Sequence, residues 1–169
     1  MGELLTLDAL CERAAELRRR GLTVSFANGH FDLLHVGHLR YLRAARARAD
    51  VLVVGVNGDA SVERLKGPGR PIVPAAERAE LLAALEPVDY VVIFEEDTPE
   101  RVLRALRPEL HCKGTDYGSP EQVPEFAVVS SYGGATELVG DPKDHATRDL
   151  IARVHALPRS PPSRGRGTD

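Results

Sequence analysis

Residues 22–56 read LTVSFANGHFDLLHVGHLRYLRAARARADVLVVGV, and this stretch predicts the fold. It contains a short strand candidate at 22–27, a loop, a helix expected at about 36–49, and an uninterrupted apolar run at 51–56. An apolar run without alternation is typical of a strand that is buried on both faces. Strand, helix and buried strand in succession form the unit from which parallel sheets are built.

The same alternation continues on both sides of this unit. Further strands are expected at 90–94, 110–113 and 135–140. Further helices are expected between the Thr6 cap and Gly21, at 75–86, from the start signal Thr98-Pro99-Glu100, and at 147–157. We therefore predict an α/β protein with a three-layer, Rossmann-like fold, in which a mainly parallel five-stranded sheet carries helices on both faces. Ligands bind such folds at the carboxyl ends of the strands.

Length and composition predict a single folded domain. The chain has 169 residues, of which 43% are hydrophobic and 28% charged, a balance that is ordinary for a globular protein. We expect the domain at 1–157. Residues 158–169 are rich in Pro, Gly, Ser and Arg and lack apolar periodicity, which predicts a disordered tail.

Charge, apolar runs and cysteines disfavour several protein classes. The formal net charge of −3 provides no basic field for nucleic acid. No apolar run approaches the ~20 residues of a membrane-spanning helix, and the N-terminal residues do not read as a signal peptide. Cys11 and Cys112 form no disulfide framework and have no metal-ligand spacing, so we expect a cytoplasmic protein.

Two histidines mark the start of the helix at 36–49. His35 and His38 stand three residues apart around Gly37, so both imidazoles face the same side of the helix. A helix N-terminus favours an anion, and paired imidazole donors stabilise the charge of a transferring phosphoryl group. The alternatives are a metal site, which lacks a third ligand with suitable spacing, or a helix cap beside a packed surface residue. The missing G-x-G-x-x-G fingerprint disfavours hydride transfer.

A single arginine supports a phosphate site. Arg78 is in the first turn of the helix at 75–86 and on its apolar face, so we expect it to point inward. A cation in the first turn is unfavourable, because it lies at the positive end of the helix dipole, unless an anion binds beside it. We interpret Arg78 as a phosphate ligand, and the alternative is a salt bridge with Asp32 or Asp59.

Further candidate ligands follow the later strands. Lys113 ends an apolar strand and presents its ammonium at the crevice, and Asp116 then suits a ribose hydroxyl or a base amino group. An ordinary turn with a solvated lysine tip is the alternative. Lys66 is expected in a loop at 64–71 that closes over phosphates or is simply solvated. Thr147 offers a hydroxyl to a phosphate, or caps the last helix.

Two segments resemble a known enzyme family. ANGHFDLLHVGHLRYL at 27–42 resembles the first signature of the HxGH nucleotidyltransferases, which bind a nucleoside triphosphate. RLKGPGRPIVPAAERAELLAALEPVDYVVIFEEDTPERVLRALRPELHCKGTDY at 64–117 strongly resembles the heptose 1-phosphate adenylyltransferase family. The resemblance runs from about residue 22 to 155. It implies transfer of AMP from ATP to D-glycero-β-D-manno-heptose 1-phosphate, giving ADP-heptose and pyrophosphate, with Mg²⁺ accompanying the triphosphate and no protein-only metal site.

The resemblance also assigns roles to individual residues. The implied catalytic residues, which stabilise or hold phosphates, are His35, His38, Lys66 and Arg78. The implied nucleotide-binding residues are Asn28, Gly29, Phe31, Asp32, Lys113, Gly114, Asp116 and Thr147. The chain departs from the family where Ala146-Thr147-Arg148 replaces a Ser-Thr-Thr-like run, where Thr115 replaces a glycine, and where His30 replaces a smaller apolar residue.

The implied reaction is one in-line displacement at the α-phosphorus of ATP. Its partners are ATP, a sugar 1-phosphate and a separate heptose kinase upstream, with no nucleic acid and no membrane, and the enzyme is expected to be a homodimer or a higher homo-oligomer. One alternative is a cytidylyltransferase acting on glycerol 3-phosphate or a related alcohol phosphate. An alternative of another class is a non-catalytic nucleotide-binding or sensor protein.

Overall fold

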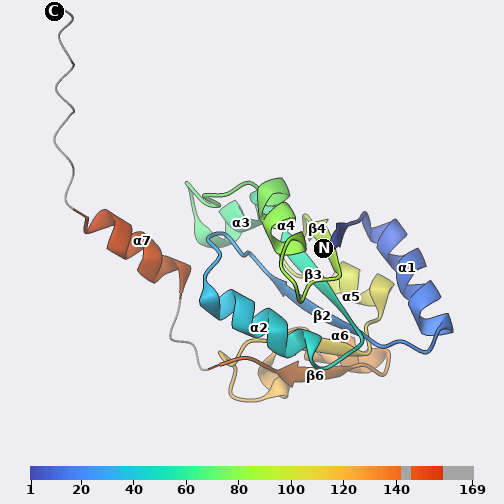
Figure 1. Ribbon diagram of the computed structural model, residues 1–169. Helices are drawn as coiled ribbons and strands as arrows, with labels where there is room; N and C mark the ends of the chain where they lie inside the picture. Colours follow the sequence, from blue (N-terminus) through green and yellow to red (C-terminus); the bar gives the residue numbers. More distant parts are fainter. Residues whose placement is uncertain (142–145, 158–169) are drawn as a thin grey trace, which may run out of the picture.

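The structure of the chain is a computed structural model that describes residues 1–141 and 146–157 (Figure 1). The tail predicted at 158–169 lies outside the described residues. Within the two described ranges, none of the helices has the length and apolar character needed to cross a membrane.

A parallel sheet forms the centre of the molecule, as the alternation of strands and helices predicts. The strands, in the order in which they lie across the sheet, are β1 (Glu3–Leu4), β4 (Tyr90–Phe94), β3 (Val51–Asn57), β2 (Val24–Gly29), β5 (Leu110–Lys113) and β6 (Ala135–Leu138). Every pairing is parallel, and all residues of β3 are buried. The predicted Rossmann-like α/β class is confirmed.

The sheet has six strands rather than the five expected. The additional strand, β1, contains only two exposed residues, too few to show any periodicity in the sequence. It forms at the sheet edge because its backbone pairs with β4, while the neighbouring Gly2 N donates to Ala83 O at 2.7 Å.

Helices cover both faces of the sheet and produce the predicted three layers (Figure 1). On one face α2 (Val36–Arg46) and α4 (Ala75–Ala83) contribute Leu42, Ala45, Ala79 and Leu82 to one core. On the other face α1 (Leu7–Arg19), α5 (Glu100–Leu106) and α6 (Phe126–Ser131) contribute Leu10, Leu17, Leu103 and Val129 to a second core. Strand residues alternate between the two cores, since Leu52 and Val54 face one and Val51 and Val53 the other.

Three helical segments were not expected from the sequence. They are α3 (Asp59–Lys66), the short 3-10 helix η1 (Pro120–Gln122) and α6. Because α3 extends to residue 66, Lys66 ends a helix instead of lying in a loop, which corrects the expectation for that residue. The eight residues of α3 bury only Ser61 and Val62, so the helix carries little apolar periodicity.

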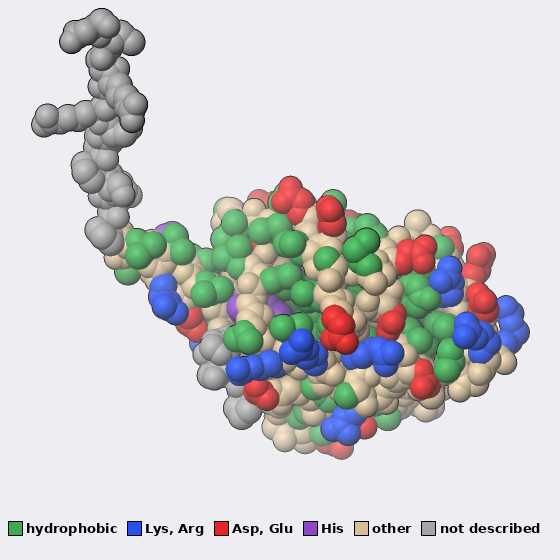
Figure 2. All heavy atoms as spheres, in the orientation of Figure 1, with side chains coloured by type: hydrophobic (Ala, Val, Ile, Leu, Met, Phe, Trp, Pro, Cys, Tyr) green, Lys and Arg blue, Asp and Glu red, His purple; other side chains and the backbone are tan. Residues whose placement is uncertain are grey.

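The last helix, α7 (Thr147–His155), lies apart from both cores (Figure 1). None of its residues is buried, and hydrophobic side chains cover part of its surface (Figure 2). Its first residue contacts the body, where the Thr147 hydroxyl donates to Leu33 O at 3.4 Å. The carboxyl ends of β2 and β5 lie beside each other where the strand order reverses, which is where a ligand site is expected.

Candidate functional site

A cavity of about 630 Å³ opens at the carboxyl ends of β2 and β5. Its walls come from the loop after β2, the first turn of α2, the end of α3, the loop after β5 and the start of α7. Every site residue predicted from the sequence lines this cavity, with the exception of Arg78. In the space-filling view, histidine side chains are visible in a hollow near the base of α7 (Figure 2).

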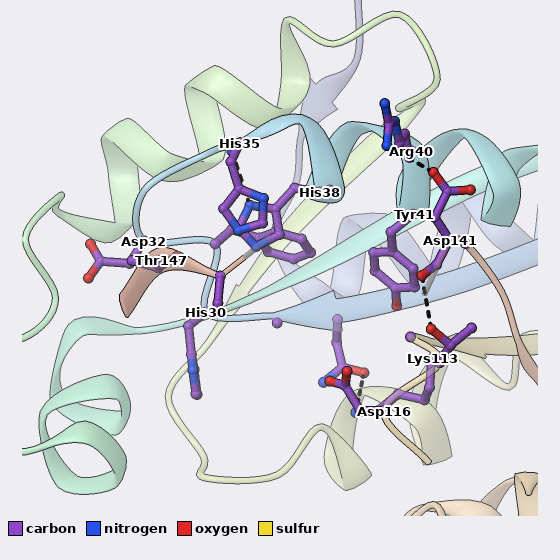
Figure 3. A pocket seen from close by; sticks show the side chains of 18 of the residues that line it. His30, Asp32, His35, His38, Arg40, Tyr41, Lys113, Asp116, Asp141 and Thr147 are labelled. Atoms are coloured by element: carbon purple, nitrogen blue, oxygen red, sulfur yellow. Dashed lines mark hydrogen bonds and ion pairs between the residues drawn. The ribbon is translucent and has the colours of Figure 1, made fainter. Parts of the chain in front are cut away.

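The two histidines of the motif form a stacked pair at the start of α2 (Figure 3). The ring centroids of His35 and His38 are 3.8 Å apart, and the ring planes differ by 20°. The edge of the Phe31 ring packs against His38 with the centroids 5.2 Å apart. The stacking restricts the orientation of both imidazoles, and the Phe31 contact further restricts that of His38.

The cap of α2 sets the proton position on His38. His35 is the N-cap residue, and its backbone N–H donates to His38 Nδ1 at 3.4 Å. An accepting Nδ1 places the proton of the neutral imidazole on Nε2, which we infer from the hydrogen bond. The capping alternative is therefore realised in part, but both histidines also line the cavity. With Nδ1 accepting, the hydrogen-bond donor of the His38 ring is its Nε2–H.

Asp32 organises the loop that follows α3. Its side chain is 3% exposed, and it accepts hydrogen bonds from Ile72 N at 2.8 Å and from Val73 N at 2.9 Å. Its other oxygen lies 2.6 Å from Arg70 Nε. This ion pair holds Arg70 at the cavity, a position that the sequence analysis did not identify. The only advance signal was the Gly- and Pro-rich character of the loop.

Arg78 occupies a different position from the one expected. It points inward as predicted, but its side chain is completely buried and it does not line the cavity. Its guanidinium lies 2.7 Å from Asp59 Oδ1 and donates to Val73 O at 2.8 Å and to His30 O at 2.5 Å. The salt-bridge alternative with Asp59 is thus the observed one, since α4 packs this face against backbone acceptors.

The ends of β2 and β5 share a polar network. Asn28 Oδ1 lies 3.0 Å from His111 Nε2 and 3.5 Å from Lys113 Nζ. Lys113 Nζ also lies 3.6 Å from the buried carboxylate of Glu125 and 6.0 Å from the centre of the Tyr117 ring. His111 and Glu125 were not identified from the sequence, because one lies within a strand and the other in an unexpected helix region. Burial, with a contribution from Lys113, lowers the pKa of His111 to about 3.

The electrostatic field of the cavity is positive around His30. Burial, together with the charges of Lys66, Arg78, Arg70 and Lys113, lowers the pKa of His30 to about 4. His30 is therefore neutral at pH 7 despite its central position. Three of these cations, Lys66, Arg70 and Lys113, line the cavity, which therefore suits phosphate oxygens.

The sequence alternative of a metal centre finds no support in the described part of the chain. Among residues 1–141 and 146–157, no three His, Cys, Asp or Glu side chains are grouped closely enough to hold a metal ion. Two of the carboxylates that border the cavity are paired with cations, Asp32 with Arg70 and Asp141 with Arg40 at 3.1 Å.

Residues 26–133, more than half of the chain, match the family model for cytidylyltransferase-like proteins. The chain belongs to the cytidylyltransferase-like family. Because this family consists of nucleotidyltransferases, the chain is a nucleotidyltransferase.

Sequence relatives of this cytidylyltransferase-like chain are larger proteins. It is 53% identical over 137 residues to the bifunctional protein HldE of Syntrophotalea carbinolica, which covers 81% of this chain and 28% of that protein. It is 50% identical over 152 residues to the bifunctional protein HldE of Geotalea uraniireducens, which covers 90% of this chain and 31% of that protein. The chain thus spans less than one third of the length of these curated relatives.

Two solved structures share the fold of this cytidylyltransferase-like chain. The lipopolysaccharide core biosynthesis protein of Thermoplasma volcanium matches with a TM-score of 0.62 and 26% identity, over 73% of this chain and 100% of that chain. Pantoate-beta-alanine ligase of Francisella tularensis, in complex with beta-gamma ATP and beta-alanine, matches with a TM-score of 0.64 and 12% identity, over 89% of this chain and 73% of that chain. The second likeness concerns the fold alone.

Proposed function

We propose that this chain transfers AMP from ATP to a heptose 1-phosphate and releases ADP-heptose and pyrophosphate. The observation that carries the proposal is the stacked pair His35 and His38, 3.8 Å apart, in a cavity bordered by Lys66, Arg70 and Lys113. Paired imidazoles next to several cations match the charge that develops on a phosphoryl group in transfer. The resemblance of segments 27–42 and 64–117 to heptose 1-phosphate adenylyltransferases supports this substrate.

The proposed chemistry is one displacement at the α-phosphorus of ATP. A phosphate oxygen of the sugar phosphate forms a new bond to the α-phosphorus. The bond between the α-phosphorus and the oxygen that bridges the α- and β-phosphates breaks, and its electron pair leaves with pyrophosphate. The sugar phosphate is already ionised at neutral pH, so the chain needs no general base. Its residues contribute by positioning the two substrates and by stabilising charge.

The individual side chains have separate roles in this proposal. The Nε2–H of His38 donates to an α-phosphate oxygen, and stacking keeps His35 directed to the same oxygens. Lys66 and Arg70 hold the outer phosphates, while Lys113, Gly114 and Asp116 meet the nucleoside. Arg78 acts indirectly, since it fixes the backbone of His30 and Val73 beside the site.

Magnesium enters this proposal bound to the triphosphate. The donors that line the cavity are mainly cations and N–H groups, which suit phosphate oxygens, and its carboxylates Asp32 and Asp141 are paired with arginines. The residues therefore fit a nucleotide that brings its own Mg²⁺. The ion would supply neutralisation of the charge on the leaving pyrophosphate.

A pyrophosphate-release assay tests the proposal. Purified chain is incubated with ATP, CTP or UTP and with heptose 1-phosphate of either anomer, or with glycerol 3-phosphate. We expect release with ATP and a heptose 1-phosphate, and its loss in His38→Ala. Turnover of CTP with glycerol 3-phosphate alone would support a cytidylyltransferase, and ATP binding without turnover would support a non-catalytic protein. Either result overturns the proposal.

A further inference from the structure

We propose that His111 is a positioning residue that holds the Asn28 carboxamide with its amino group towards the phosphate oxygens of a bound nucleotide. This inference rests on the proposed nucleotide site, but it requires only nucleotide binding and no turnover. His111 itself does not line the cavity, whereas Asn28 does. The histidine would therefore act on the ligand only through Asn28.

Strand register brings the two side chains together. β2 and β5 pair in parallel with Phe26 opposite His111, and Asn28 is the fifth residue of the six-residue strand β2, where the strand reaches the cavity. His111 is fully buried, and its ring lies against Phe26 with the centroids 5.9 Å apart. From this position Nε2 reaches Asn28 Oδ1 at 3.0 Å. Packing within the sheet thus fixes the direction from which His111 approaches.

Because Lys113 can only donate a hydrogen bond, it determines which amide atom of Asn28 points towards His111. A neutral histidine can donate to an asparagine oxygen or accept from an asparagine nitrogen, so His111 alone does not fix the orientation of the Asn28 amide. A lysine ammonium only donates, and Lys113 Nζ lies 3.5 Å from the same atom of Asn28. That atom is therefore the acceptor Oδ1, and His111 must carry its proton on Nε2. With Oδ1 held by two donors, Nδ2 is the end of the amide that serves a ligand in the cavity.

The position requires a neutral donor. Lys113 already places a positive charge beside Asn28 and is balanced by the buried Glu125 at 3.6 Å. A second cation in the same buried place would be desolvated and would lack a counter-charge. Burial and Lys113 keep the pKa of His111 at about 3, so the imidazole stays neutral. It orients Asn28 without adding charge to the centre of the sheet.

The ligand that this arrangement recognises is a hydrogen-bond acceptor with negative charge. The amino group of Asn28 would open onto a cavity that also holds the His38 donor and the cations Lys66 and Arg70. Phosphate oxygens satisfy all of these groups at once. Loss of His111 would leave Lys113 as the single, more distant partner of Oδ1, and the amide would be free to rotate.

The experiment compares variants that keep or remove the donor. His111→Gln places an amide N–H close to the position of Nε2, whereas His111→Leu fills the space without a donor and His111→Asn is too short to reach. Binding of non-hydrolysable ATP and CTP analogues is measured by calorimetry, together with thermal unfolding. We expect about tenfold weaker binding of the preferred analogue for His111→Leu and His111→Asn, and a change of less than about twofold for His111→Gln.

A matched control and a double mutant separate positioning from general destabilisation. Thr136→Val removes a buried hydroxyl from the strand residue paired with His111, and it should leave binding unchanged. In an Asn28→Ala background, His111→Leu should have no further effect on binding. An equal loss with and without Asn28, equal loss for His111→Gln and His111→Leu, or no binding of either analogue to the wild-type chain overturns the inference. Binding without turnover would contradict only the proposed function.

Discussion

The two ends of the cavity are built very differently. At the end formed by the sheet, Asn28, Asp32 and Lys113 are held by ion pairs or hydrogen bonds, and the chain around them is packed in two cores. At the other end, α7 buries none of its residues and is connected through a 3.4 Å hydrogen bond from Thr147. The side chains at the sheet end are thus held in place by the packed body, whereas α7 borders the cavity without burying any residue of its own.

The largest effect is expected at the sheet end, in the histidine pair. His38→Ala removes a donor that is aligned by its neighbours, so kcat for pyrophosphate release should fall by the equivalent of about 2.7–4 kcal/mol in transition-state stabilisation. His35→Ala should show a similar loss. His155→Ala, on α7, serves as the control and should keep wild-type turnover. A kcat close to that of the wild type for both His35→Ala and His38→Ala would contradict the proposed role of the two histidines in stabilising the transition state.

The second prediction concerns Arg78, whose hydrogen bonds hold the backbone of Val73 and His30 beside the cavity. Arg78→Met leaves the carbonyl groups of Val73 and His30 without their donor, so unfolding in denaturant should show a loss of about 2–3 kcal/mol. KM for ATP should change much less than stability. Arg64→Ala removes an exposed pair with Asp97 and should cost less than about 1 kcal/mol. A large rise in KM at unchanged stability would instead make Arg78 a phosphate ligand.

The third prediction uses pH to test the buried network. The pKa of His111 is lowered to about 3 in the folded chain, below the ordinary value of 6.5, so the unfolded chain binds a proton first as the pH falls. The stability that neutral His111 contributes is therefore complete above pH 6.5 and is lost between pH 6.5 and 3, with about 1.4 kcal/mol lost at pH 5.5. Chemical denaturation of wild type and His111→Gln at pH 7.5 and 5.5 measures this. An identical loss in both proteins would contradict it.

The smallest effect on stability is expected at α7. Thr147→Ala removes one long hydrogen bond to Leu33, so the free energy of unfolding should change by less than about 1 kcal/mol. KM for ATP should nevertheless rise, because the hydroxyl lines the cavity. Pyrophosphate-release kinetics at varied ATP measure the rise, and Thr147→Ser, which keeps the hydroxyl, is the control. If Thr147→Ala lowers stability as much as Arg78→Met, the contrast between the two ends is wrong.

The sequence predicted those parts of the molecule that depend on local patterns. Apolar runs such as 51–56 located the buried strands, and the spacing of His35 and His38 located the start of α2. Short elements were missed, because the two residues of β1 and the eight of α3 show no clear periodicity. Their formation depends on backbone pairing and on neighbours that are distant in sequence.

Contacts across the sheet could not be predicted in the same way. The inward direction of Arg78 followed from helix geometry, but the choice of Asp59 as its partner depends on how α3 and α4 pack. Arg70 reaches the cavity through Asp32, 38 residues away in the chain. His111 meets Asn28 over 83 residues, and only the strand register shows that contact.

The position of Tyr117 makes the site accessible to optical measurement. Its ring lies 6.0 Å from the Lys113 ammonium and lines the cavity, while the chain contains no tryptophan at all. In Tyr117→Trp the single indole would therefore be the only strong emitter in the protein, directly beside a cation whose surroundings change when a nucleotide binds. Its fluorescence would report occupancy in real time, without any label and without waiting for product.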